Sequence, residues 1–242
     1  MFEEYKKLIE EARGRVYAVA VKTPLDPARE ISLRHANNIW LKREDQQPVF
    51  SYKLRGAYNL MASLPPEACR QGVIAASAGN HAQGVALAAQ KLGIAALIVM
   101  PKTTPEIKIN AVKRLGAEVI LHGNTYDESN EHAQQLAQKR HLTMVPPFDH
   151  PLVIAGQATV GVEILEQHPG PIDIIFVPVG GGGLIAGIAA YVKQQRPEIR
   201  IIGVEADEAP SMYRALKEGR RVTLDHFGIF ADGAAVRQAG EE

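Results

Sequence analysis

The stretch VIAASAGNHAQGVALAAQKLGIAALIVM, residues 73–100, decides the fold class. It begins with the apolar run VIAA and ends with AALIVM, and both runs are typical of strands buried in a core. Between them, residues 79–93 have the apolar spacing of a helix, and Gly93 is a typical helix end. Two buried strands joined by a helix predict a parallel β-α-β unit.

The same alternation of strands and helices continues to residue 145. We expect strands at residues 117–121 and 142–145, and helices at residues 104–116 and 125–140. In the first of these helices, Thr104 is the predicted N-cap, Pro105 the first helical residue and Gly116 the end. Thr125 and Glu128 have the spacing of a capping box at the start of the second helix.

A second alternating block follows the proline-rich residues 144–151, which we interpret as the crossing between two lobes. Its predicted elements are a helix at 153–167, a strand at 172–179, a helix at 184–195, a strand at 199–206 and a helix at 209–219. An amphipathic helix opens the chain, with apolar spacing at Phe2, Tyr5, Leu8, Ile9 and Ala12. The sequence therefore predicts an α/β fold of two lobes, each with a mainly parallel sheet flanked by helices.

The composition excludes several classes of function. The 242 residues are 46% hydrophobic, and 27 basic residues balance 27 acidic ones, so neither a nucleic acid nor a membrane is the expected partner. The apolar run IAALIVM is far shorter than a membrane span. The single cysteine, Cys69, and the absence of a signal-peptide pattern predict a cytoplasmic location. A small molecule is the predicted ligand.

Two glycine-containing segments lie where a strand ends and a helix begins, which is where parallel sheets bind ligands. Gly180 to Gly183 follow a buried strand, and their N–H groups suit a phosphate, although a tight turn is the simpler alternative. Residues 77–81, SAGNH, suit an anion such as a carboxylate, or plain N-capping of the helix. His81 has no second candidate ligand nearby, so we interpret it as a polar wall and not as a metal ligand.

The third feature is Lys53, within PVFSYKLRGAY at residues 48–58. It is either an exposed lysine or an amine made nucleophilic by a desolvated pocket. If that amine binds an aldehyde cofactor, a phosphate site is needed elsewhere, because pyridoxal phosphate carries both groups. The glycines at 180–183 provide one. Two polar pairs are interpreted as structural: Glu205 with Asp207, and Asp149 with His150.

Four ordered segments resemble the biosynthetic threonine ammonia-lyases, which belong to the tryptophan-synthase-β-like pyridoxal phosphate enzymes of fold-type II. The segments are KREDQQPVFSYKLRGAY, ASAGNHAQGVALAAQKLG, VPPFDHPLVIAGQAT and FVPVGGGGL, and the resemblance runs from about Thr23 onward. It implies that Lys53 binds the aldehyde of pyridoxal 5'-phosphate and that Asn80 bonds its ring hydroxyl. It implies a phosphate site formed by Gly180, Gly181, Gly182, Gly183 and Leu184. The implied site for the substrate carboxylate consists of Ser77, Ala78, Gly79, Asn80 and His81.

The resemblance implies β-elimination from L-threonine, with Lys53 as general base, to give 2-oxobutanoate and ammonia as in isoleucine biosynthesis. L-Serine would give pyruvate. A serine or other amino-acid racemase is an alternative, but related racemases have a serine base where this chain has Ala78. Those racemases also bind a divalent metal after the equivalent of Glu205, whereas Ser211 stands where a carboxylate is expected. We therefore predict no metal.

The family pattern divides the chain into a larger cofactor lobe, residues 1–52 and 152–242, and a smaller lobe, residues 53–151, that carries the substrate-carboxylate loop. Compared with that pattern the larger lobe is incomplete, and the residue that faces the pyridine nitrogen is absent. Missing strands would leave apolar surface exposed. A catalytically inactive cofactor-binding fragment is therefore a further alternative. The resemblance implies a homo-oligomer, a dimer or tetramer, for full-length members.

Overall fold

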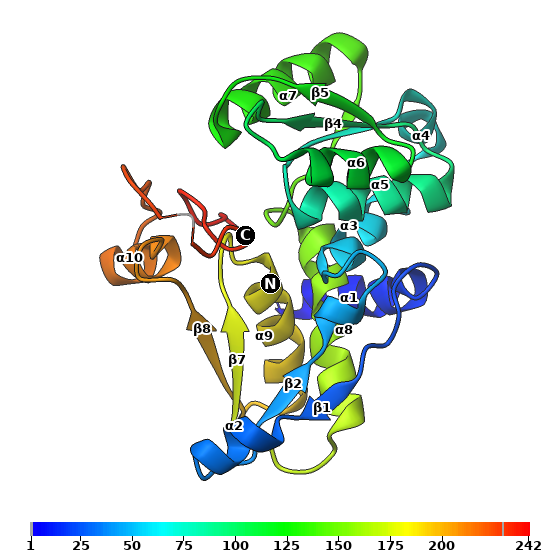
Figure 1. Cartoon of the computed structure of the whole chain (residues 1–242). Coiled ribbons are helices and arrows are strands. Elements are labelled where there is room, and N and C mark those ends of the chain that lie inside the picture. The colour runs from blue at the N-terminus through cyan, green and yellow to red at the C-terminus, as the bar shows by residue number, and fades with distance from the viewer. Residues whose placement is uncertain (1, 229) are drawn as a thin grey trace.

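Four parallel strands form the larger sheet of the computed structural model, which describes residues 2–228 and 230–242 (Figure 1). The strands are β3 (Val73–Ala76), β4 (Ala96–Met100), β5 (Glu118–Leu121) and β6 (Thr143–Met144), in the spatial order β5-β4-β3-β6. Every residue of β3 and β4 is buried. The β-α-β unit predicted for residues 73–100 is therefore confirmed.

Helices cover both faces of this sheet, because successive side chains of a strand point to opposite sides. The helices against its strands are α5 (Asn80–Leu92), α6 (Glu106–Arg114) and α7 (Tyr126–Arg140), while α3 (Lys53–Met61) packs on α5 and α4 (Pro66–Gln71) precedes β3. On one face, Val73 and Ile98 belong to a core that includes residues of α3, α5 and α6. On the other face, Ile74 and Leu97 pack with Ala133 of α7. Figure 1 shows α7 on one side of the sheet and α5 and α6 on the other.

The second sheet has two parallel strands within the described residues, and it packs against helices of its own. Its elements are α1 (Phe2–Val16), α8 (Pro151–Gln167), β7 (Ile174–Pro178), α9 (Gly183–Gln195), β8 (Arg200–Val204) and α10 (Ser211–Glu218). Ile175 and Val177 of β7 are buried with residues of α8 and α9. The elements predicted with bounds agree with the structure to within two residues at each end, and α1 continues to Val16, beyond Ala12, the last residue of its predicted apolar pattern.

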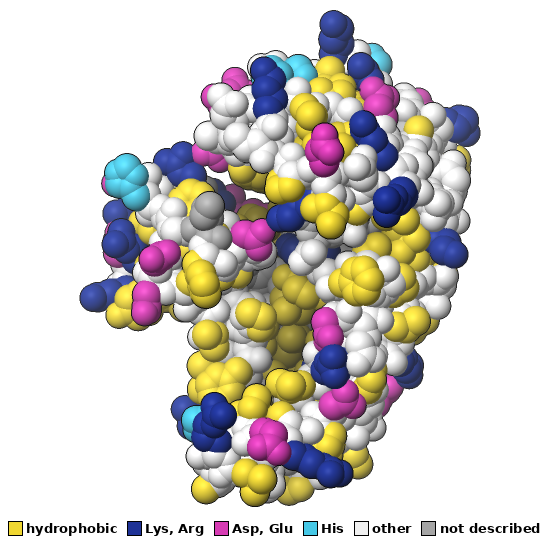
Figure 2. Space-filling model, viewed as in Figure 1, with side chains coloured by type: hydrophobic (Ala, Val, Ile, Leu, Met, Phe, Trp, Pro, Cys, Tyr) yellow, Lys and Arg dark blue, Asp and Glu magenta, His cyan; other side chains and the backbone are white. Residues whose placement is uncertain are grey.

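The opposite face of the second sheet is apolar and exposed. Phe176 lies between the two buried residues of β7 and is 65% exposed, and Val204 of β8 is 50% exposed. Figure 2 shows hydrophobic side chains at the surface where β7 runs in Figure 1. The face that carries Phe176 and Val204 is therefore apolar surface in contact with solvent.

One antiparallel pair of strands is absent from the sequence prediction. β1 (Leu25–Pro27) pairs with β2 (Trp40–Lys42), and α2 (Arg29–Arg34) and the 3₁₀ turn Glu44–Gln46 accompany them. Each strand has only three residues, which is too short to show an alternating pattern. The pair is thus a local structure that periodicity cannot detect.

The start of α6 also corrects the prediction. The N-cap is Pro105, with ψ 141°, and the first helical residue is Glu106, so neither Thr104 nor Pro105 has its predicted position. The Thr104 side chain is buried, and its hydroxyl has no hydrogen-bond partner among the described residues. Because that hydroxyl points into the protein, it does not cap the helix.

The capping box at the start of α7 is confirmed. The Glu128 N–H donates to Thr125 Oγ1 at 3.3 Å, and the Thr125 N–H donates to Glu128 Oε2 at 3.0 Å. We expect Thr125→Ala to lower the free energy of unfolding by about 1 kcal/mol, since one amide of the first turn loses its acceptor. Thr125→Ser keeps the hydroxyl and is the control in urea unfolding. An equal loss in both variants would contradict this explanation.

Residues 144–151 connect β6 to α8 and so link the two sheets. His150 caps α8, because its Nδ1 accepts the Leu152 N–H at 3.1 Å. Asp149 Oδ1 accepts the N–H groups of Glu241 and Glu242 at 2.9 and 3.1 Å. Both side chains therefore have the structural roles that the sequence predicted. None of the helices in the described residues combines the length and hydropathy of a membrane span.

Candidate active site

Lys53 begins α3, and its amine is enclosed although part of the side chain remains accessible to solvent. Nζ donates to the carbonyl oxygen of Pro147 at 2.8 Å. It lies 5.6 Å from the ring centroid of Tyr52 and 6.0 Å from that of Phe148. Burial disfavours the charged amine and lowers the pKa of Lys53 from 10.5 to about 8. A fraction of the amine is thus neutral and nucleophilic near neutral pH.

Residues 77–81 join β3 to the N-terminus of α5. The N-cap of α5 is Gly79, whose N–H donates to Ser77 Oγ at 3.1 Å, and no described side chain caps the helix. Plain N-capping by Ser77 or Asn80 is therefore not found. Ala78 and Gly79 are half-buried, Asn80 is exposed, and a Cβ built on Gly79 would meet no described atom within 4 Å. The first-turn N–H groups beside this open space suit an anion.

His81 is a buried wall of the same region. Its Nε2 lies 2.8 Å from the carbonyl oxygen of Val145, which assigns the proton to Nε2 in the neutral ring. Burial, together with the nearby charge of Lys53, lowers the pKa of His81 to about 3. The described residues contain no group of three or more His, Cys, Asp or Glu side chains arranged for a metal ion. The neutral ring therefore fixes the loop 77–81 to the crossing segment.

The neutral state of His81 makes the fold sensitive to acid. Because the unfolded ring binds its proton near pH 6.5 and the folded ring only near pH 3, stability is lost as the pH falls through this window. We expect His81 to lower the free energy of unfolding by about 2–3 kcal/mol when the pH falls from about 7 to about 4.5. Denaturant unfolding at both pH values should show a smaller acid loss for His81→Gln. An acid loss in His81→Gln as large as that of the wild type would contradict this explanation.

The glycines 180–183 lead from β7 into α9. The first amide that closes a helical hydrogen bond is that of Ala186, which donates to Gly182 O at 2.9 Å. The N–H groups of Gly183, Leu184 and Ile185 precede that bond and lie at the positive end of the helix. Gly182 has φ +98°, a conformation that disfavours any residue with a Cβ. The Leu184 side chain is buried, so its N–H group is the part that we assign to the phosphate site.

Phe148 lies against both the lysine and the glycine loop. A Cβ on Gly181 would lie 2.3 Å from the Phe148 ring, and one on Gly183 would lie 2.8 Å from the Phe148 carbonyl oxygen. The same ring is 6.0 Å from Lys53 Nζ. The structure thus brings both Lys53 and the glycine loop close to one aromatic ring. The sequence pattern does not identify Phe148 or Pro147 as site residues, although an aromatic residue within a proline-rich crossing is a usable signal.

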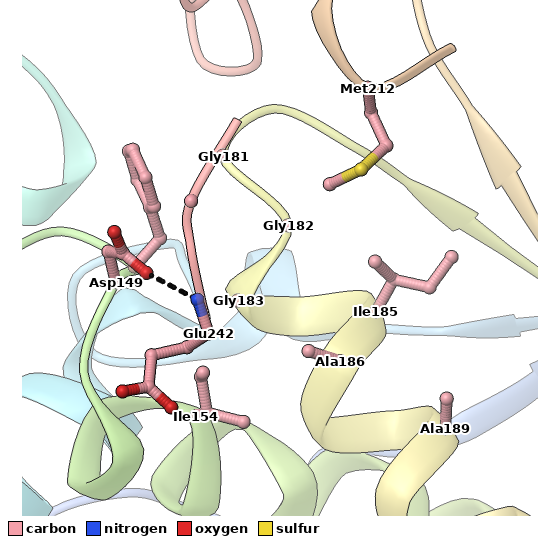
Figure 3. A pocket seen from close by; sticks show the side chains of 12 residues that line it. Asp149, Ile154, Gly181, Gly182, Gly183, Ile185, Ala186, Ala189, Met212 and Glu242 are labelled. Atoms are coloured by element: carbon pink, nitrogen blue, oxygen red, sulfur yellow. Dashed lines mark hydrogen bonds between the residues drawn. The ribbon is translucent and has the colours of Figure 1, made fainter. Parts of the chain in front are cut away.

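A cavity of about 240 Å³ adjoins the glycine loop (Figure 3). It is lined by Phe148, Asp149 and Gly181–Gly183, by Ile154, Ile185, Ala186, Ala189 and Met212, and by Gly240 and Glu242. Gly240 N–H donates to Gly181 O at 2.9 Å, and the Glu242 N–H bond to Asp149 is visible in Figure 3. Neither Lys53 nor Asn80 lines this cavity, so we place the reactive part of the site at the Lys53 amine, outside it.

These features define an α/β protein with an enclosed, partly neutral amine and a helix-terminal loop suited to phosphate. Residues 17–242 match the family described as pyridoxal-phosphate dependent enzyme, and the chain belongs to this family, with its fold-type II α/β architecture. The donor set fits the cofactor, because an amine for the aldehyde and first-turn amides for the phosphate both lie close to Phe148.

Relatives and solved structures agree with this family. The chain is 59% identical over 228 residues to the threonine dehydratase biosynthetic, chloroplastic, of Arabidopsis thaliana. The aligned region is 94% of this chain but only 38% of that relative, so the chain spans well under half of its length. The processed form of threonine deaminase isoform 2 from Solanum lycopersicum is 52% identical with a TM-score of 0.96, covering 99% of this chain and 66% of that one. Maize serine racemase is 33% identical with a TM-score of 0.93, and the match covers 97% of this chain and 71% of the racemase chain.

Proposed function

We propose that this chain carries the catalytic lysine and cofactor site of a threonine ammonia-lyase. The reaction is dehydration and deamination of L-threonine to 2-oxobutanoate and ammonia, as in isoleucine biosynthesis, with L-serine giving pyruvate. The observation that carries the proposal is the Lys53 amine, enclosed by Tyr52, Phe148 and Pro147, with a pKa of about 8. The names of the Arabidopsis and Solanum relatives support threonine as the substrate.

The proposed roles follow from the chemistry of each group. Lys53 would hold the aldehyde of pyridoxal phosphate and Asn80 its ring hydroxyl, while the main chain of Gly180–Gly183 and Leu184 would hold the phosphate. When bound, the cofactor supplies a conjugated ring that spreads the negative charge formed at the substrate Cα. The neutral Lys53 amine takes the Cα proton, and its lowered pKa keeps it in the basic form for part of the time near pH 7.

The loop 77–81 would bind the substrate carboxylate. The N–H groups at the start of α5 lie beside the open space at Gly79, and Ser77, Ala78, Asn80 and His81 complete this loop. Because His81 is neutral, it adds no charge, and it orients the loop through Val145. Tyr52 and Phe148 keep water away from the lysine, which preserves its lowered pKa.

The domain division that we propose assigns residues 53–151 to a smaller lobe and residues 1–52 with 152–242 to the cofactor lobe. The separate sheets support it, since β3 to β6 lie within the first range and β7 and β8 within the second. We further propose that the protein is a homo-oligomer and lies in the cytoplasm. Its partner is a small-molecule substrate, and it binds neither nucleic acid nor membrane. The name of the Arabidopsis relative places that protein in the chloroplast, so the location here is to be tested by cell fractionation.

Two other functions have specific observations in their favour. The exposed apolar face at Phe176 and Val204 favours a cofactor-binding chain without turnover. The likeness to maize serine racemase favours racemisation, but the methyl group of Ala78 cannot carry a proton. The likeness to threonine dehydratases is closer, at 59% identity compared with 33%.

One experiment separates the three functions. The purified chain is incubated with pyridoxal phosphate, and formation of 2-oxobutanoate from L-threonine is followed by a coupled assay. The lyase predicts ketoacid formation. A visible cofactor band without ketoacid would support the chain that binds without turnover, and D-serine formed from L-serine, measured by chiral chromatography, would support the racemase. A chain that gives neither a band nor a product would refute the proposed cofactor site.

A further inference from the structure

A buried cluster of charges lies beneath α3, apart from the candidate site. Arg55 is fully buried, and two carboxylates share its guanidinium group. Its Nε donates to Glu44 Oε2 at 2.7 Å and its Nη1 to Glu163 Oε1 at 2.6 Å. Its Nη2 donates to the second oxygen of each carboxylate, at 2.8 Å for Glu44 and 3.1 Å for Glu163. Arg55 is thus held at two edges by two different segments of the chain.

Further partners complete the cluster. Lys42 Nζ donates to Glu163 Oε2 at 2.5 Å, and the Tyr17 hydroxyl donates to Glu163 Oε1 at 2.8 Å. Arg55 Nη1 also donates to Thr159 Oγ1 at 3.0 Å. The two cations balance the two carboxylates, so the cluster is neutral. It joins α3 and α8 to the segment after α1, to β2 and to the 3₁₀ turn Glu44–Gln46.

Stability alone does not explain this cluster. Removing charges from water is costly, and apolar residues of similar volume often replace a buried ion pair without loss of stability. Apolar side chains, however, make no directional hydrogen bonds that would fix the orientation of a helix. A guanidinium group that bonds two carboxylates through several planar N–H groups fixes both the rotation and the position of the helix that carries it.

The helix that Arg55 fixes is the one that begins with Lys53. The main chain around these residues is closely packed: a Cβ on Gly84 of α5 would lie 3.1 Å from the carbonyl carbon of Lys53. A Cβ on Gly156 of α8 would lie 2.7 Å from the carbonyl oxygen of Arg55. These contacts set how closely α3 approaches its neighbours. They do not set its rotation, which is the quantity that directs the Lys53 side chain.

We propose that Arg55, held between Glu44 and Glu163, is a positioning residue for Lys53. It sets the rotation and register of α3 and thereby holds the Lys53 amine at the Pro147 carbonyl, beside Phe148. The role assigned to Lys53 rests on the proposed function, whereas the coupling of the cluster to the amine can be measured without it. In a chain with a weakened cluster, α3 can rotate, and the amine gains access to water.

The test compares two glutamates on α8. Glu163→Gln removes the charge at the centre of the cluster and keeps the shape, whereas Glu166→Gln removes an exposed carboxylate that pairs with Arg13 and Lys22. In chain without cofactor, the rate at which Lys53 reacts with acetic anhydride is measured against pH by mass spectrometry. We expect Glu163→Gln to raise the midpoint of this profile by about 1 pH unit. At pH values below the midpoint, the neutral fraction of the Lys53 amine would then be roughly tenfold smaller. Glu166→Gln should leave it unchanged.

Affinity for pyridoxal phosphate gives a second measurement, and we expect about tenfold weaker binding in Glu163→Gln. Should that variant not fold, Tyr17→Phe removes a single hydrogen bond to Glu163 and should shift the profile less, in the same direction. Folded variants that are less stable but keep the wild-type midpoint would overturn the proposal. A chain that makes no 2-oxobutanoate but shows the shift would refute the lyase and retain the positioning role.

Discussion

Replacing Lys53 by alanine is expected to abolish the visible band that the chain forms with pyridoxal phosphate. The same variant should form 2-oxobutanoate at least about 10²–10⁴-fold more slowly, because the general base and the covalent attachment are lost together. The structural reason is that the amine at the Pro147 carbonyl has a pKa of about 8. Absorption spectra and the coupled ketoacid assay, on the same preparation, measure both losses.

The matched control is Lys22→Ala, which removes an exposed lysine paired with Glu166. It should keep both the band and the activity. The fold should survive Lys53→Ala, because the folded pKa of Lys53 lies below the unfolded one and the buried charge costs stability below about pH 8. That cost disappears as the pH rises from about 8 to 10.5, and it is absent from the variant. A band that persists in Lys53→Ala would show that another amine binds the cofactor.

Gly156→Ala is expected to destabilise the fold by roughly 3 kcal/mol or more. The added Cβ would lie 2.7 Å from the Arg55 carbonyl oxygen and 2.7 Å from Gly56 Cα, and both atoms belong to the main chain of α3. Since main-chain atoms cannot rotate away as a side chain does, α3 and α8 must separate. Urea unfolding followed by circular dichroism measures the loss.

Gly14→Ala is the matched control for a helical glycine. Gly14 lies in α1, and a Cβ there would meet no described atom within 4 Å. Alanine should therefore raise the free energy of unfolding by about 0.5–1 kcal/mol, through helix propensity alone. If Gly156→Ala and Gly14→Ala changed the free energy of unfolding by the same amount and sign, close packing of α3 on α8 would not explain the effect of Gly156→Ala.

The sequence predicted most of the fold because its elements carry strong local signals. The runs around β3 and β4 are apolar throughout, and the capping box of α7 lies within four residues. Elements without such signals were missed: β1 and β2 have three residues each, and Thr104 was assigned to a cap although its side chain is buried. Local pattern therefore predicts elements well and their exact starts less well.

The candidate site was predictable only in part. Glycines after a strand and a lysine in an aromatic context can be recognised along the chain, and family resemblance adds a role for Asn80 that remains a prediction. The partner of the Lys53 amine, Pro147, is 94 residues away, and the Tyr17 hydroxyl reaches Glu163 across 146 residues. Such contacts join segments that are far apart in the sequence, for which the sequence carries no local signal.

The close approach of α3, α5 and α8 has a consequence for motion. Where Gly84 of α5 and Gly156 of α8 meet α3, main chain lies against main chain with no layer of side chains between them. Local opening of α3 would have to part three helices at once, so the amide hydrogens of residues 57–61 should exchange with solvent only through global unfolding. The main chain of α3 therefore stays packed on α5 and α8 for as long as the protein remains folded, whatever the surface loops do.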